Sequence, residues 1–219
     1  LNIINEHRGQ VDAFGRLDGE RRAGLVTRLH PLQANWIWWR DKWSEKGRPD
    51  PAVEKQIDER LRSLSPSQSN GFDRDARAAL EATFRDGDPN QGFTFLPINA
   101  AEPHWDGRWL GYKEAETLSR TRPDLSRLLL VELIEIHFYP RNMAVRDTEP
   151  VEAKYRIHVD FFDLHPTKPG TNFWYEHIVT RPLRDWLAGG ESLIAGDLAE
   201  ALSVVAEKTR SLLAEPPAG

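Results

Sequence analysis

Three segments late in the chain have the composition of β-strands and follow one another closely: Leu128–Tyr139, Ala153–Leu164 and Asn172–Thr180. Their leucine, β-branched and aromatic side chains pack well on a pleated, half-buried surface. The two connections, residues 141–149 and 166–170, are shorter than the crossover of about a dozen residues that parallel neighbours need. The three segments therefore predict an antiparallel β-meander.

The segments on either side of this meander have helical patterns. Helices are predicted after Pro31, after Asp50, over Asp73–Phe84, over Lys113–Arg120 and over Leu193–Leu213. Helices that are grouped before and after the strands, rather than alternating with them, indicate an α+β fold. We expect an N-terminal helical region, the antiparallel meander, and a C-terminal amphipathic helix.

Two further segments complete the expected organisation. Residues 1–30 are predicted to form an irregular or fragmentary helical lead-in, and residues 93–97 a short strand that Pro97 confines to an edge. The 219 residues fit one domain. We expect a single α+β domain over 1–219, with a soft sub-boundary near 86–92 between a helical part, 1–90, and a sheet-plus-helix part, 91–219.

Composition excludes several classes of function. The chain has no cysteine, which rules out disulfides, thiolate metal sites and a cysteine nucleophile. Its net charge is −5, all of it arising after residue 90, so bulk-charge binding to nucleic acid is not expected. No apolar run approaches the roughly 20 residues of a membrane span, and residues 1–6 lack a signal-peptide pattern. We expect a cytoplasmic protein without a membrane partner.

Strand alternation gathers polar side chains on one face of the predicted meander, because successive side chains point to opposite faces. This set comprises Glu135, His137, Arg156, His158 and Asp160, joined by Glu176 or His177 depending on the register. His137, His158 and Asp160 are candidate acid–base residues, and with Glu135 they are candidate ligands of a divalent metal. An ordinary solvated sheet face would have the same composition.

His158-Val-Asp160 also matches the first half of the facial triad of non-haem iron oxygenases. The third ligand of that triad is a distant histidine, whereas here the next histidines, His165 and His177, follow His158 by 7 and 19 positions. Trp174 lies near the same face, and an aromatic rim suits a pocket or a covered surface better than open water.

Four tryptophans fall within residues 36–43. Leu32, Trp36, Trp39 and Trp43 recur at helical spacing and are typical of core packing, whereas Trp38 falls off that stripe. Tryptophan and arginine are enriched at interface hot spots. Trp38, Trp43, Arg156 and Trp174 are therefore candidate binding residues for a protein partner or a second copy of the chain.

Glu152-Ala-Lys154 matches the E-x-K half of a metal-dependent nuclease motif, with Asp147 or Glu135 as the upstream carboxylate. No Gly-rich phosphate loop, G-x-S-x-G elbow or H-E-x-x-H helix is present. The leading hypothesis is a non-enzymatic or accessory protein that binds another macromolecule through its aromatic-rich helix or its polar sheet face. The alternatives are a small metal-dependent or acid–base enzyme on that face and, more weakly, the nuclease.

Overall fold

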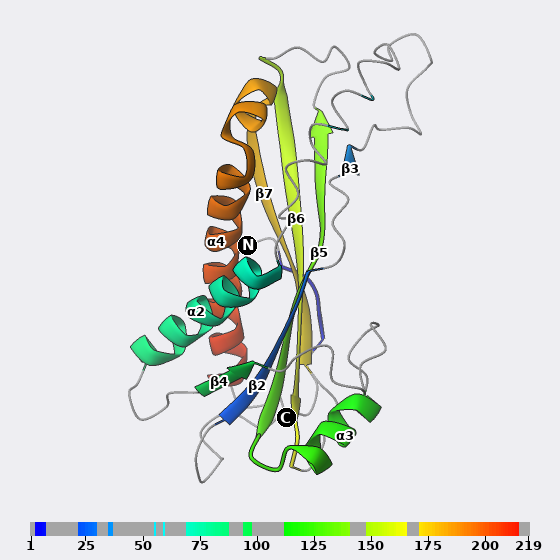
Figure 1. Cartoon of the computed structure of the whole chain (residues 1–219), viewed down its shortest axis with the longest axis vertical. Coiled ribbons are helices and arrows are strands. Elements are labelled where there is room, and N and C mark those ends of the chain that lie inside the picture. The colour runs from blue at the N-terminus through cyan, green and yellow to red at the C-terminus, as the bar shows by residue number, and fades with distance from the viewer. Residues whose placement is uncertain are drawn as a thin grey trace.

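The structure is a computed structural model that describes residues 3–7, 22–29, 35–36, 55, 59, 69–87, 94–97, 112–140, 148–165 and 171–214. Three long strands dominate it: β5 (Arg127–Pro140), β6 (Pro150–Asp163) and β7 (Thr171–Pro182). Each pairs antiparallel with the next. The predicted meander is confirmed, and its strands run side by side through the length of the molecule in Figure 1.

Four shorter strands extend this meander: β1 (Ile3–His7), β2 (Arg22–Leu29), β3 (Asn35–Trp36) and β4 (Thr94–Pro97). The described strands form one seven-stranded sheet in the order β1-β7-β6-β5-β2-β4, and β3 also pairs with β5. β1 is antiparallel to β7, whereas β2 is parallel to both β5 and β4. Strands from both sides of residues 86–92 therefore share the sheet.

The N-terminal strands correct two sequence predictions. The irregular or helical lead-in is wrong for Ile3–His7 and Arg22–Leu29, which are strands, and the helix predicted through Trp36 is wrong at that residue. Asn35 and Trp36 pair with His137 and Phe138 of β5. Short apolar runs fit either a helix or a strand by pattern alone, and the open edges of a long meander decide in favour of the strand.

Helices cover both faces of the sheet. α2 (Ser69–Gly87) and α4 (Leu183–Ala214) lie on one face, and α3 (Tyr112–Thr121) lies on the other, as Figure 1 shows. The predicted α+β class, with helices before and after the meander, is confirmed. No helix in the described part of the chain is long and apolar enough to cross a bilayer.

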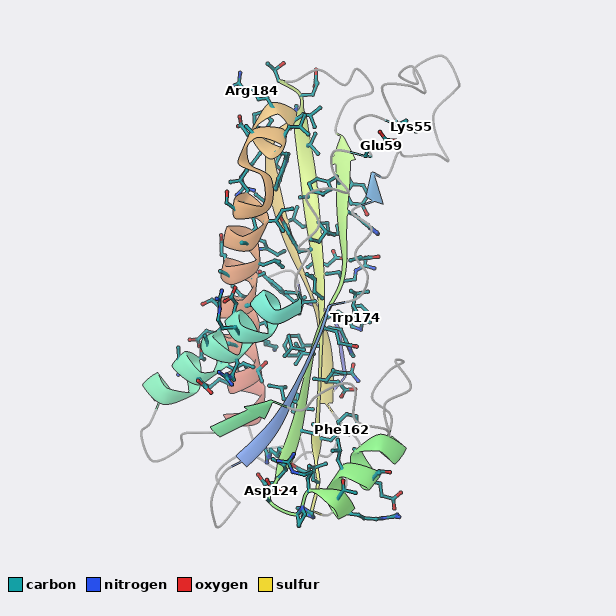
Figure 2. The ribbon with its side chains drawn as sticks, viewed as in Figure 1. Lys55, Glu59, Asp124, Phe162, Trp174 and Arg184 are labelled. Atoms are coloured by element: carbon teal, nitrogen blue, oxygen red, sulfur yellow. The ribbon has the colours of Figure 1, made fainter. Side chains whose placement is uncertain are left out.

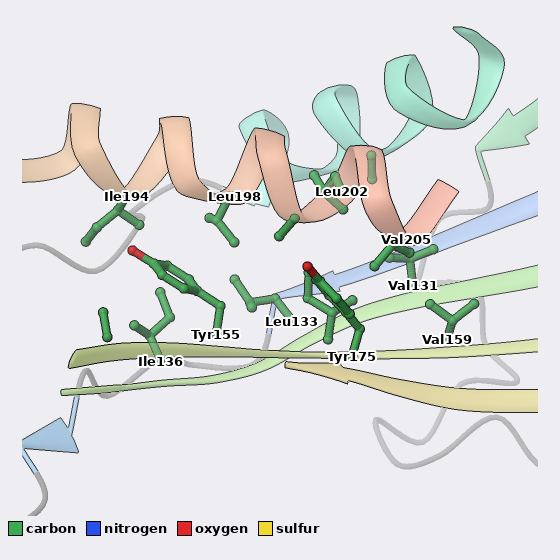
Figure 3. Packing of buried hydrophobic residues seen from close by; sticks show 14 of the residues in the cluster. Val131, Leu133, Ile136, Tyr155, Val159, Tyr175, Ile194, Leu198, Leu202 and Val205 are labelled. Atoms are coloured by element: carbon green, nitrogen blue, oxygen red, sulfur yellow. The ribbon is translucent and has the colours of Figure 1, made fainter. Parts of the chain in front are cut away.

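The main core lies between the sheet and the helices α2 and α4. Alternate residues of β6 face it, including Ile157 and Val159, and they meet Leu198 and Leu202 of α4. The hydroxyl groups of Tyr155 and Tyr175 point toward α4 in Figure 3. Burying each large apolar side chain contributes about 1.5–3 kcal/mol, so this interface stabilises α4 on the sheet.

A polar network joins α4 to the strands within this core. Asp197 of α4 accepts a hydrogen bond of 2.8 Å from the Tyr155 hydroxyl and two from the guanidinium of Arg181 in β7. Arg181 also stacks over the Trp186 ring, at 4.6 Å from its centroid. The indole N–H of Trp186 donates to the carbonyl of Val151. These contacts fix the position of α4 along the sheet.

A second, smaller core lies beneath α3 on the opposite face. Its buried members are Ala115, Leu118, Leu125, Leu128, Leu130, Phe162 and Leu164. Figure 2 shows Phe162 near α3. A buried ion pair between Arg127 and Asp163, with Nε and Oδ1 2.9 Å apart, lies where the two strands end. The second face is therefore covered at the α3 end.

The first turns of α4 are separated from the rest by Gly190, whose φ of 55° and ψ of −142° are not helical. The sequence predicted this helix from Leu193, yet residues 183–189 are helical too. Only glycine adopts this backbone conformation without strain.

Replacing Gly190 with alanine should lower the free energy of unfolding by about 1–3 kcal/mol, because a Cβ atom is strained at this φ and ψ. Gly196→Ala is the matched control: Gly196 lies in the same helix, and an added Cβ would meet no atom within 4 Å. It should be neutral or stabilising by up to about 1 kcal/mol. Urea unfolding of the two variants measures the difference, and equal effects would contradict the strain argument.

Candidate functional site

A bulge in β5 decides which side chains share the second face. The register with β6 shifts between Leu133, which pairs with Ile157, and Glu135, which pairs with Arg156. Before the bulge the second face takes the even-numbered residues of β5, and after it the odd-numbered ones. Glu132 therefore joins Glu135 and His137 on one face, whereas strict alternation places it on the other.

Beyond the bulge, side chains from three strands form one cluster of ion pairs and hydrogen bonds, here called the polar face. Its six half-buried members are Glu135, His137, Tyr139, Lys154, Arg156 and Glu176. Arg156 lies at its centre, with Nη1 2.6 Å from Glu135 Oε1 and Nη2 2.8 Å from Glu176 Oε1. Lys154 Nζ lies 3.3 Å from the other Glu176 oxygen. The register therefore places Glu176, rather than His177, in this cluster.

The charged side chains of the polar face compensate one another. Burial raises the pKa of the Glu176 carboxyl, but hydrogen bonds from Arg156 and Lys154 outweigh it, so the net shift is downward. Burial also lowers the pKa of His137, and Arg156 and Lys154 add to this effect against Glu135. Two cations thus face two carboxylates and a neutral imidazole. Because Lys154 and Arg156 are both paired with carboxylates, the polar face offers no unpaired cation to an anionic ligand.

His137 also connects Glu135 to Tyr139. Its Nε2 lies 3.2 Å from Glu135 Oε2, and its Nδ1 lies 3.2 Å from the Tyr139 hydroxyl. A neutral imidazole can donate to the glutamate and accept from the tyrosine. This chain resembles a nucleophile–base–orienter arrangement. However, burial raises the pKa of Tyr139, which keeps the phenol protonated and unsuited to nucleophilic attack.

A second group of polar side chains lies between the polar face and the α3 core. His158 Nδ1 is 3.1 Å from Glu132 Oε2, and the two residues are only 3% and 1% exposed. The Trp174 ring lies against His158, with centroids 4.7 Å apart. All three occupy one register row across β5, β6 and β7. Figure 2 shows Trp174 on the face away from α4.

Asp160 lies one register row closer to α3, between Leu130 and Asn172. Its Oδ1 is buried without a hydrogen-bond partner. Burial raises the pKa of this carboxyl to about 7, and the nearby Glu132 adds to the effect, while a hydrogen bond from the Phe161 backbone opposes it. Asp160 therefore holds a proton through much of the range below neutral pH.

The structure separates the predicted catalytic and metal-binding residues into two groups. His137 is opposite Lys154, four residues along β6 from His158, which corresponds to roughly 13 Å at the usual rise. Glu135 contacts His137, while His158 contacts Glu132. Within the described ranges, no three histidine, aspartate or glutamate side chains are arranged to hold a metal ion.

The other predicted site residues have different surroundings. Lys154 of the E-x-K pair contacts Glu176 and lies 5.6 Å from the Tyr139 ring centroid, so its charge is engaged within the polar face. Trp38 and Trp43, and also Asp147, lie outside the described residues. Arg156 lies in the polar face, and Trp174 lies on the same face of the sheet, against the ring of His158.

Glu132 is the site residue that sequence reasoning missed. The bulge inverts the alternation of β5 at residue 134, so counting back from Glu135 puts Glu132 on the wrong side. One signal could have found it: Glu132 is the single charge within the apolar run Leu128–Ile134. A charge there must be paired when the strand is buried.

Comparisons with known proteins do not assign the chain to a family. No family model matches it, and no curated protein does. Among solved structures, the PelC dodecamer from Paraburkholderia phytofirmans is 10% identical, with a TM-score of 0.39 and coverage of 96% of each chain. The hypothetical protein CT253 from Chlamydia trachomatis is 7% identical, with a TM-score of 0.44, covering 89% of this chain and 98% of that one. Neither likeness assigns a function.

Proposed function

We propose that this chain is a non-enzymatic, accessory protein that binds another protein through the polar face. The observation that supports this most directly is the preformed ion-pair network around Arg156. Its guanidinium contacts the carboxylates of Glu135 in β5 and Glu176 in β7 at the same time. Arginine and tyrosine are enriched at interfaces. Side chains that are already ordered lose less conformational entropy when a partner covers them.

Catalysis is less well supported by the same geometry. The Glu132–His158 pair is almost fully buried, so a substrate cannot reach the imidazole in this conformation. Tyr139 is more accessible, but burial raises its pKa and keeps the phenol protonated, which does not favour nucleophilic attack. The polar face is therefore proposed as a recognition surface, and the acid–base, metal-dependent and nuclease alternatives stay predictions.

Site-specific photo-crosslinking tests the proposal. Tyr139 is replaced by the photoreactive aromatic residue p-benzoylphenylalanine, which preserves a ring beside Lys154. Irradiation of expressing cells should give a discrete protein adduct. Adding Arg156→Gln should reduce its yield by about thirtyfold, the equivalent of a hot spot of 2 kcal/mol.

The same crosslinker at Ser203, an exposed position on α4, is the control. It should give no such adduct, because α4 lies on the other face of the sheet. Equal adducts at both positions, or an adduct at Tyr139 that Arg156→Gln leaves unchanged while circular dichroism is native, would refute recognition through the polar face.

A further inference from the structure

The outer edge of β7 is covered along only part of its length by the described strands. β1 pairs with Asn172, Trp174 and Tyr175. From Glu176 to Pro182, the described part of the chain provides no partner on that side, whereas the inner edge pairs with β6 throughout. Unpaired backbone N–H and C=O groups at such an edge are a template for another strand.

The middle of this stretch, residues 178–180, lacks the features that usually protect an edge. Natural sheets protect their edges with lysine, proline, bulges or inward charges. Here Ile178-Val179-Thr180 is uncharged and β-branched, its register with β6 has no shift, and proline appears only at Pro182. Ile178 is 39% exposed and is the one large apolar side chain exposed among the described residues.

The charges that flank the segment are already engaged on its own sheet. Glu176 is held by Arg156 and Lys154 on the second face. Arg181 is held by Asp197 on the core face. An incoming strand therefore meets no unpaired charge of either sign at Glu176 or Arg181. This favours a strand of the same neutral, β-branched character over an acidic or a basic peptide.

We propose that the Glu176–Thr180 edge of β7 pairs antiparallel with the same edge of a second copy of the chain. A two-fold axis at Ile178 places Ile178 opposite Ile178, and Glu176 opposite Thr180, so no like charges oppose one another. Side chains of directly opposite residues point to the same side of a sheet. The two copies would therefore form one continuous sheet, with the second face of each copy on the same side. β1 limits the pairing, because it occupies the edge at Tyr175.

Sedimentation velocity over a range of protein concentrations tests the dimer. The unmodified chain should show a reversible monomer–dimer equilibrium, and Ile178→Lys should weaken it by at least tenfold, because two lysines then meet at the axis. Ser203→Lys adds the same charge at an exposed position of α4 and should leave the dimer constant unchanged. A chain that stays monomeric at every concentration, or a dimer that Ile178→Lys does not weaken, overturns the proposal.

The absence of cysteine allows a direct test of the register. Ile178→Cys should form a disulfide-linked dimer under mild oxidation, since the two thiols face each other. Thr180→Cys is on the same edge, but its two copies would be roughly 13 Å apart, beyond disulfide reach. It should crosslink far more slowly. Equal rates overturn the proposed register.

Amide hydrogen exchange separates a second copy from other occupants of the edge. Protection of residues 178–180 should increase with protein concentration. Protection in a monomeric sample would mean that other residues of this chain cover the edge, and it would overturn the proposal. The photo-crosslink at Tyr139 and the disulfide formed by the Ile178→Cys variant are measured separately, so this proposal and the proposed function can fail independently.

Discussion

Replacing Asp197 with alanine is expected to lower the free energy of unfolding by about 2–4 kcal/mol, because it removes a buried carboxylate that pairs with a partly exposed guanidinium and accepts a hydrogen bond from a buried phenol. Asp197 is 3% exposed, and it is the common partner of Arg181 and of the Tyr155 hydroxyl. Its removal leaves a guanidinium and a buried phenol without their acceptor. Burial is the largest cause of the raised pKa of Tyr155 and persists without Asp197, so ionisation of the phenol offers no relief.

Thermal unfolding followed by circular dichroism measures this effect, which corresponds to a fall in Tm of about 10 °C for a chain of this length. Asp185→Ala is the matched control, because Asp185 is paired with Arg184 on the same helix but in solvent. It should change stability by less than about 0.5 kcal/mol. Similar losses for both variants would show that the network does not anchor α4.

The second large expected effect is a dependence of the free energy of unfolding on pH, caused by Asp160. Because the folded state raises the pKa of this carboxyl from 3.8 to about 7, folded Asp160 binds more protons than unfolded Asp160 between these values. The free energy of unfolding should therefore fall as the pH rises from 4 to 7 and then level off, by about 2–4 kcal/mol in total. Asp160→Asn should remove this component.

Urea unfolding of both proteins at several values between pH 5 and pH 8 measures the difference. All other titratable side chains are the same in both proteins, so the stability of the variant relative to the unmodified chain isolates the effect of Asp160. We expect Asp160→Asn to be more stable than the unmodified chain at pH 8, with the advantage shrinking toward pH 5. A difference that does not vary with pH would show that Asp160 titrates normally in the folded protein.

Local sequence patterns predicted much of the fold from residue 69 onward. The meander, α2, α3 and most of α4 follow from periodicity, because each element buries one face against its neighbours. Proline at residue 97 predicted an edge strand, and β4 lies at the edge of the sheet. Of the polar residues predicted to share one face of the meander, Glu135, His137 and Arg156 lie together in the polar face, whereas His158 and Asp160 lie outside that cluster.

Contacts between distant segments decided the rest. Ile3–His7, Arg22–Leu29 and Asn35–Trp36 are strands because β7 and β5 offer backbone groups to pair with. Their own residues fit a helix or a loop as well. The bulge in β5 likewise has no local signature, yet it brings Glu132 beside His158 and leaves His137 in a different cluster.

The sequence by itself thus determined the α+β class, the meander and the face on which its polar residues gather, because alternation of side chains is a local property of a strand. Only the tertiary structure decided how those residues divide. Strand register determines which of these residues lie opposite one another on neighbouring strands. Burial beneath α3 and against the neighbouring strands determines how far each side chain is desolvated. The same physics raises the pKa of Asp160 and pairs Arg156 with Glu176.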